Sequence, residues 1–259
     1  MDNQLLETKV RGSGQAVVIL HGLFGSADNL ARVALELEKD YQVFSMDLRN
    51  HGSSFHSVEM NYMLMVEDVK RTIEHYGLES VSMFGHSMGG KVAMAFALAF
   101  PERVTKLIVA DIAPVTYPEH HHAIFKALNS VPLNQVKNRR EADDYLKVYV
   151  DEVGVRQFLL KSLALSKDKD ASWKFNLTAI QKNYSKIIEG QSATKAYLGK
   201  VLFIAGGLSD YIKAEHKADI LALFPNAKLK VIPETGHWLH AEKPSIFIGI
   251  CQRFLQEKK

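Results

Sequence analysis

Cysteine is nearly absent from the sequence, since Cys251 is the only one in 259 residues. A single thiol cannot form an internal disulfide, and so low a cysteine content is typical of proteins in a reducing compartment. Long hydrophobic runs are also missing, because the apolar stretch at residues 92–100 has about half the length of a membrane-spanning helix. Residues 1–10 lack the basic-then-apolar order of a secretory signal. We therefore expect a soluble, cytoplasmic protein without a membrane span.

The sequence also lacks a large excess of positive or negative charge. The 32 lysines and arginines are nearly balanced by 29 aspartates and glutamates, which leaves a net charge of +3 with neutral histidines. The densest basic group, residues 137–140, is followed at once by acidic residues, a pattern typical of a solvated helix face. A nucleic-acid partner is therefore not expected. The composition, 47% hydrophobic and 24% charged, indicates a globular protein with a substantial core.

Consecutive histidines in the stretch EHHHA, residues 119–123, invite a metal-site interpretation. Adjacent histidines cannot all face one ion from a helix, because only residues three or four apart share a helix face. Apart from Glu119, no acidic or histidine partner stands at helical spacing to complete a set of ligands. This stretch therefore predicts the exposed start of a helix and no metal site.

Short apolar runs alternate with longer amphipathic segments along most of the chain. Most of the runs are continuously apolar, as in parallel strands that are covered on both faces, and they lie at residues 16–22, 41–48, 81–87, 106–112, 200–207 and 228–236. Helical periodicity marks the segments between them, at residues 28–39, 63–76, 89–100, 215–224 and 244–257. This alternation predicts an α/β fold with a doubly wound, mostly parallel sheet.

The alternation breaks at residues 114–190, where the pattern is helical throughout. An insertion that follows a strand lies at the sheet edge where open α/β sheets bind ligands. We therefore predict a core made of residues 1–113 and 191–259, with residues 114–190 forming a helical cap, or lid, over that edge.

The stretch GHSMG, residues 85–89, places Ser87 between a predicted strand and a predicted helix. This is the context that the G-x-S-x-G motif requires, because the turn is tight and its serine is presented as a nucleophile. Side chains at positions 85 and 89 would collide with neighbouring backbone, which explains the two glycines. The alternative is a serine that only caps the helix beginning at Met88.

A serine hydroxyl is a weak nucleophile until a base takes its proton. His237 follows the last predicted strand, in the stretch ETGHWLHAEKP, and is our general base; His240, three residues further on, is the local rival. The base needs an acid to orient it, and here the residues leave two candidates. Asp111 ends the strand after the one that bears Ser87, and Asp210 follows the penultimate strand. Both keep the chain order Ser, Asp, His.

The stretch HGLFGS, residues 21–26, follows the first strong apolar strand and carries two glycines that let backbone face the site. We expect the N–H groups of Leu23 and Met88 to form the oxyanion hole, in which backbone donors stabilise a developing negative charge. Phe24 and Trp238 are candidates for the wall of an acyl pocket, because such pockets are largely apolar.

Together these residues resemble the α/β-hydrolase family over essentially the full chain. The stretch DLRNHGSS at residues 47–54 resembles the YbfF-type bacterial esterases, as do HGLFGSADNL and GHWLHAEKP. The resemblance implies Asp111 as the acid, although Asp210 stands at the more general family position. It also implies hydrolysis of acyl esters or thioesters without a metal or organic cofactor. Arg49, Asn50 and His51 are expected to shape their turn and to serve the site indirectly.

The sequence thus predicts a serine esterase or thioesterase that acts on a small-molecule acyl substrate through an acyl-enzyme. Opening of a lactone or hydrolysis of a carbon–carbon bond on the same residues is the nearest alternative. A receptor that binds ligands without catalysis is the alternative from another class of protein. No feature of the sequence requires more than a monomer.

Overall fold

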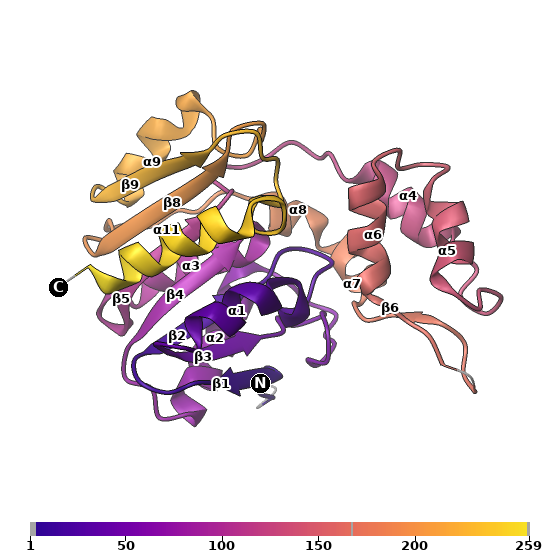
Figure 1. The fold of residues 1–259 in the computed structure, drawn as a ribbon, viewed down its shortest axis with the longest axis horizontal. Helices are drawn as coiled ribbons and strands as arrows, with labels where there is room; N and C mark the ends of the chain where they lie inside the picture. The colour runs from indigo at the N-terminus through magenta and orange to yellow at the C-terminus, as the bar shows by residue number, and fades with distance from the viewer. Residues whose placement is uncertain (1–3, 167, 258–259) are drawn as a thin grey trace.

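A seven-stranded sheet is the centre of the computed structural model, which describes residues 4–166 and 168–257 (Figure 1). Residues 1–3, the start of the segment inspected for a signal, lie outside this part. The strand order is β1-β3-β2-β4-β5-β8-β9, with β1 (Thr8–Arg11), β2 (Ala16–Leu20), β3 (Gln42–Met46), β4 (Val81–His86), β5 (Val104–Ala110), β8 (Lys200–Gly206) and β9 (Ala227–Ile232). β1 pairs antiparallel with β3, and the other pairs are parallel. The predicted mostly parallel sheet is confirmed.

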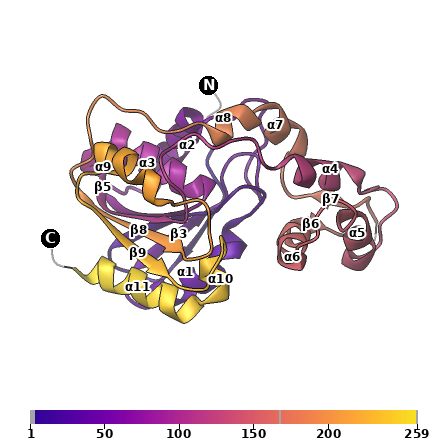
Figure 2. The same cartoon turned by 90° about the horizontal axis from the view of Figure 1, so that it is seen from above.

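Helices cover both faces of the sheet because its strands alternate their side chains between two apolar layers (Figure 2). Val17 and Ile19 of β2 pack in the layer that contains α1 (Ala31–Leu37) and α11 (Pro244–Gln256). Val18 and Leu20 pack in the opposite layer, with α2 (Tyr62–His75), α3 (Met88–Ala99) and α9 (Lys217–Leu223). α1, α9 and α11 lie within segments that the sequence predicts to be helical, and α2 and α3 each begin one residue before theirs.

The segment between β5 and β8 carries a separate group of helices beside the sheet (Figure 1). These are α4 (His122–Ser130), α5 (Arg139–Leu146), α6 (Val153–Lys161), α7 (Leu177–Lys182) and α8 (Tyr184–Ile188). They lie within the predicted cap range, residues 114–190, and we call them the cap helices; the predicted domain boundaries themselves stay a prediction. Within the described residues, no helix has both the length and the apolar character that crossing a membrane requires.

The cap range is not helical throughout, and that expectation is wrong at one place. β6 (Leu163–Ala164) and β7 (Ser172–Trp173) form an antiparallel pair just after α6. The helix ends at this point because Ser162 makes contacts outside it. Its hydroxyl donates to the Phe24 carbonyl at 2.7 Å, and its own carbonyl accepts from the Lys174 N–H at 2.8 Å. These tertiary hydrogen bonds override the apolar periodicity that continues past Lys161.

One buried lysine joins the cap segment to the core. The Lys91 ammonium, on α3, donates to the carbonyls of Val115, Ile188 and Glu189 at 2.8, 3.0 and 2.5 Å. Val115 lies on the stretch that leads into the cap helices, and Ile188 and Glu189 lie where α8 ends and the chain leaves them. An ammonium has three protons to donate, so all of its donors are satisfied at this junction.

Candidate active site

Ser87 lies on a sharp turn between β4 and α3. Its backbone has φ of 53° and ψ of −122°, a conformation that non-glycine residues rarely adopt and that stores about 1–3 kcal/mol of strain. A Cβ on Gly85 would lie 2.2 Å from the carbonyl oxygen of Gly89, and one on Gly89 would lie 2.4 Å from that of Leu20. The predicted need for glycine at both positions is confirmed, because the turn brings backbone against backbone.

His237 is held by a buried carboxylate. Its Nδ1 lies 2.8 Å from Oδ2 of Asp111, which has no exposed surface. The same carboxylate accepts the Gly206 N–H at 2.9 Å and the hydroxyl of Ser209. Because carboxylate oxygens accept, His237 carries its proton on Nδ1, and Nε2 keeps a free lone pair. An imidazole in this state can take a proton from a neighbouring hydroxyl.

Asp210 and His240, the alternatives to Asp111 and His237, do not form this hydrogen-bonded pair. Asp210 lies on the surface with its side chain 92% exposed, and its carboxylate is 3.3 Å from the Lys213 ammonium. His240 is buried, and its Nδ1 has no hydrogen-bond partner among the described residues. The structure therefore brings Asp111 together with His237 and leaves Asp210 apart from it.

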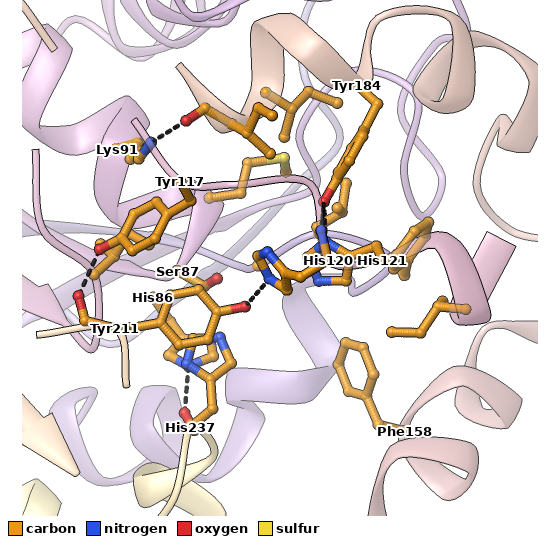
Figure 3. A pocket seen from close by; sticks show the side chains of 18 of the residues that line it. His86, Ser87, Lys91, Tyr117, His120, His121, Phe158, Tyr184, Tyr211 and His237 are labelled. Atoms are coloured by element: carbon orange, nitrogen blue, oxygen red, sulfur yellow. Dashed lines mark hydrogen bonds between the residues drawn. The ribbon is translucent and has the colours of Figure 1, made fainter. Parts of the chain in front are cut away.

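Two aromatic rings enclose the His237 imidazole (Figure 3). The Tyr211 ring stacks on it with centroids 4.0 Å apart and planes 24° apart, and the His86 ring lies 4.7 Å away. Nε2 of His86 donates to the His237 carbonyl at 2.8 Å. Burial, reinforced by the neighbouring histidines, holds the pKa of His86 well below its ordinary value, so this ring stays neutral. His237 is thus fixed through its ring and its backbone.

The predicted oxyanion donors lie beside the serine. Met88 opens α3, where the first N–H groups have no acceptor within the helix. Across residues 4–166 and 168–257, neither the Leu23 nor the Met88 N–H donates a hydrogen bond to the protein. Gly22 lets the Leu23 segment approach, because a Cβ there would lie only 3.2 Å from Cβ of Ser87. Both N–H groups are therefore open to an acceptor from outside the protein, and their role as oxyanion donors stays a prediction.

Residues 49–52 (RNHG) contact the loop that carries Leu23. Arg49 forms a buried ion pair with Asp68, with Nε–Oδ2 at 2.5 Å and Nη2–Oδ1 at 2.8 Å. His51 accepts the Phe24 N–H on Nε2 at 3.1 Å. The stretch touches the loop of predicted oxyanion donors rather than the serine.

A cavity of about 230 Å³ opens above the serine. Its sheet side includes Ser87, His237, Phe24 and Trp238, so both residues predicted for an apolar wall do line it. The cap helices close the other side with largely apolar side chains, among them Ile124, Val155 and Leu159. Phe158 also lies on this side (Figure 3). The cavity is mostly apolar and has its reactive groups at one end.

The expected exposed helix start at residues 119–123 is confirmed, since α4 begins at His122 and only His121 in this stretch is not exposed, but two of the histidines also reach the site. His121 is partly buried, lines the cavity and bonds the Tyr184 hydroxyl through Nδ1 at 2.6 Å. His120 lies 2.7 Å from the Tyr211 hydroxyl through Nε2. Burial lowers the pKa of His121 to about 3. The sequence carries no local signal for these contacts, because each partner lies more than 60 residues away.

Comparisons with known proteins agree with this fold and site. A family model described as "alpha/beta hydrolase fold" matches residues 15–244. Esterase YbfF of Escherichia coli is 38% identical and covers 93% of each chain. The mouse sn-1-specific diacylglycerol lipase is also 38% identical, over 93% of this chain and 80% of the relative. A solved structure titled "Marine microorganism esterase" superposes with a TM-score of 0.94 at 43% identity, over 97% of this chain and 99% of that one.

The chain therefore belongs to the α/β-hydrolase fold family. Within that family the predicted resemblance to the YbfF-type bacterial esterases is confirmed. The predicted class of enzyme, a carboxylic ester hydrolase, is confirmed with it.

Proposed function

We propose that the chain hydrolyses small carboxylic esters or acyl thioesters through a Ser87–His237–Asp111 triad. The observation that carries the proposal is the 2.8 Å hydrogen bond from His237 to the buried Asp111, at the end of a cavity that Ser87 also lines. A hydroxyl, a base with a free lone pair and an acid that orients the base are the parts that nucleophilic acyl transfer needs.

The first half of the reaction forms the acyl-enzyme. The Ser87 hydroxyl attacks the acyl carbonyl while Nε2 of His237 takes its proton. The charge on the carbonyl oxygen is stabilised by the N–H groups of Leu23 and Met88, and each such donor is worth about 3 kcal/mol in the transition state. The tetrahedral adduct then expels the alcohol or thiol, which leaves with the proton from His237.

The second half regenerates the enzyme. His237 takes a proton from water, the resulting hydroxide equivalent attacks the acyl carbon, and the Ser87–acyl bond breaks. The acid departs, and Ser87 regains its proton from His237. Asp111 stays ionised throughout and stabilises the imidazolium that forms in each half.

Cavity size favours a small substrate. Its volume of about 230 Å³ lies below the range of roughly 300–1,000 Å³ that is typical of ligand pockets. One short acyl group fills this space, and the leaving group then extends toward the mouth. A relative is named as a diacylglycerol lipase, but we propose short esters for this chain because of its cavity.

The test is hydrolysis of p-nitrophenyl esters of increasing acyl length by wild type and Ser87→Ala. We expect wild type to prefer short acyl groups, and Ser87→Ala to lose about 10⁴–10⁶ in kcat while its melting temperature changes little. A fluorophosphonate probe should label wild type and not the variant. Equal activity in both proteins would contradict the triad, and a wild type that neither hydrolyses esters nor labels would favour the receptor alternative.

A further inference from the structure

Phe24 adopts a conformation that its own residue type disfavours. It is the third residue of the turn at residues 22–25, which is closed by a 3.1 Å hydrogen bond from the Gly25 N–H to the Gly22 carbonyl. Its φ is 61°, and a positive φ at this turn position usually belongs to glycine or asparagine. A strained residue of this kind persists only where its surroundings hold it.

Both backbone polar atoms of Phe24 are held, and the two partners come from different parts of the molecule. The N–H donates to Nε2 of His51, in the core, at 3.1 Å. The carbonyl accepts from the hydroxyl of Ser162, at the end of cap helix α6, at 2.7 Å. The turn is thus fixed from the sheet side and from the cap side at once.

The contacts of the His51 ring fix Nε2 as its hydrogen-bond acceptor. Its Nδ1 lies 2.9 Å from the Arg49 carbonyl, which can only accept, so the proton is on Nδ1 and Nε2 presents a lone pair. Burial, reinforced by His21, lowers the pKa of His51 to about 3, so the ring stays neutral. Arg49 is in turn held by Asp68.

Ser162 connects the same turn to the wall of the cavity. Its side chain is buried, and its carbonyl accepts from the first residue after β7, so it does not move independently of the cap. The helix that ends at Ser162 also supplies Val155, Phe158 and Leu159 to the cavity. A shift of α6 therefore moves the wall and the Ser162 hydroxyl together.

We infer that His51 and Ser162 are positioning residues for the oxyanion hole, and that Ser162 links the placement of the cap to the placement of the Leu23 N–H. The inference rests on the proposed function, in which that N–H stabilises the transition state. Leu23 directly precedes Phe24 in the turn, so its N–H keeps its direction only while the turn is held. A misplacement of about 1 Å in such a group can cost about a hundredfold in rate.

The experiment compares Ser162→Ala with a matched control, Ser130→Ala. The Ser130 hydroxyl also donates to a carbonyl, that of Ala127 at 2.8 Å, but its bond lies wholly within α4 and has no link to the turn. For each variant, kcat and KM for p-nitrophenyl acetate are measured, with the Ki of a trifluoromethyl ketone. The ketone forms a tetrahedral adduct with the serine, and its oxyanion reports on the hole.

Ser162→Ala should lower kcat roughly tenfold to a hundredfold and raise the Ki of the ketone by the same factor, because a misaligned donor loses part of its 10²–10³ contribution. Its KM and melting temperature should stay near wild type, and Ser162→Thr should restore kcat and Ki. Ser130→Ala should match wild type throughout. If Ser162→Ala does not fold, Ser162→Cys takes its place, because a thiol donates only weakly.

An unchanged Ki in Ser162→Ala, or a loss confined to KM, would overturn the inference while leaving the proposed function intact. A wild type that neither hydrolyses the ester nor binds the ketone would overturn both. Equal losses in Ser162→Ala and Ser130→Ala would show a general weakening of the cap and would also overturn the inference.

Discussion

The two walls of the cavity are built in different ways. On the sheet side, Ser87, Asp111 and Phe24 all have positive φ and stand directly after strands or in tight turns, so the backbone sets where their polar groups lie. On the cap side, Phe158 and Val155 reach the cavity from an ordinary helix. The sheet wall therefore specifies chemistry through backbone conformation, and the cap wall specifies shape through side chains.

Among the substitutions that compare the two walls, Asp111→Asn on the sheet wall should have the largest effect. The amide cannot stabilise the imidazolium or hold the same His237 tautomer, so kcat should fall by about 10⁴. Asp210→Asn should remain within about twofold of wild type, because that side chain is exposed and apart from the site. Steady-state kinetics on one ester decide the matter, and comparable losses in both variants would contradict our choice of acid.

The next largest effect should be a loss of stability from Lys91→Met, at the junction between the core and the cap segment. Three carbonyls would lose their charged donor, and we expect the free energy of unfolding to fall by about 3 kcal/mol. Lys186→Met is the control, because this exposed cap lysine pairs with the carboxylate of Glu189, and such surface pairs contribute about 0–1 kcal/mol. Denaturant unfolding measures the free energy of unfolding of both variants. Equal losses would show that the three Lys91 hydrogen bonds contribute no more to stability than a surface ion pair.

Buried histidines behind the sheet wall predict a dependence of stability on pH. Burial, with neighbouring charges, lowers the pKa of His240 to about 3, below the 6.5 of an exposed histidine. Between these values the unfolded chain binds a proton that the folded chain does not, so stability is lost as the pH falls below 6.5. This histidine alone accounts for about 2 kcal/mol at pH 5. His240→Phe should reduce the loss of unfolding free energy between pH 7 and pH 5 by about 2 kcal/mol, and an unchanged loss would contradict this.

The smallest effect is expected on the cap wall. Phe158→Ala enlarges the cavity on its cap side, so we expect the preferred acyl chain to lengthen and kcat/KM for the shortest ester to fall by about tenfold. The change should appear mainly in KM, since no group that reacts is altered. Val148→Ala, on an exposed cap position, should keep the wild-type preference. A large fall in kcat for Phe158→Ala would mean that the apolar side chains of α6, and not only Ser162 at its end, affect the reacting groups.

The same difference explains how much could be predicted from sequence. Strand ends and glycine turns leave local patterns, so the sheet and the candidate nucleophile, base and oxyanion donors were predictable. β1 was not predicted, because its four residues are mostly exposed and lack an apolar run. Asp111 and Asp210 could not be separated by spacing, because the path of the loop after β8 decides which carboxylate reaches His237. The Tyr211 and His121 contacts depend on the cap's position, which periodicity does not encode.

The three hydrogen bonds from Lys91 to main-chain carbonyls affect which changes of sequence the cap can accept. Its three acceptors are main-chain carbonyls, a group that every residue carries. The attachment therefore recognises the path of the chain and not the identity of its side chains. At this junction, an insertion of different sequence would keep the Lys91 hydrogen bonds, provided that its two ends follow the same path. At the Lys91 junction, the attachment of the cap therefore sets a requirement on backbone path and none on side-chain identity.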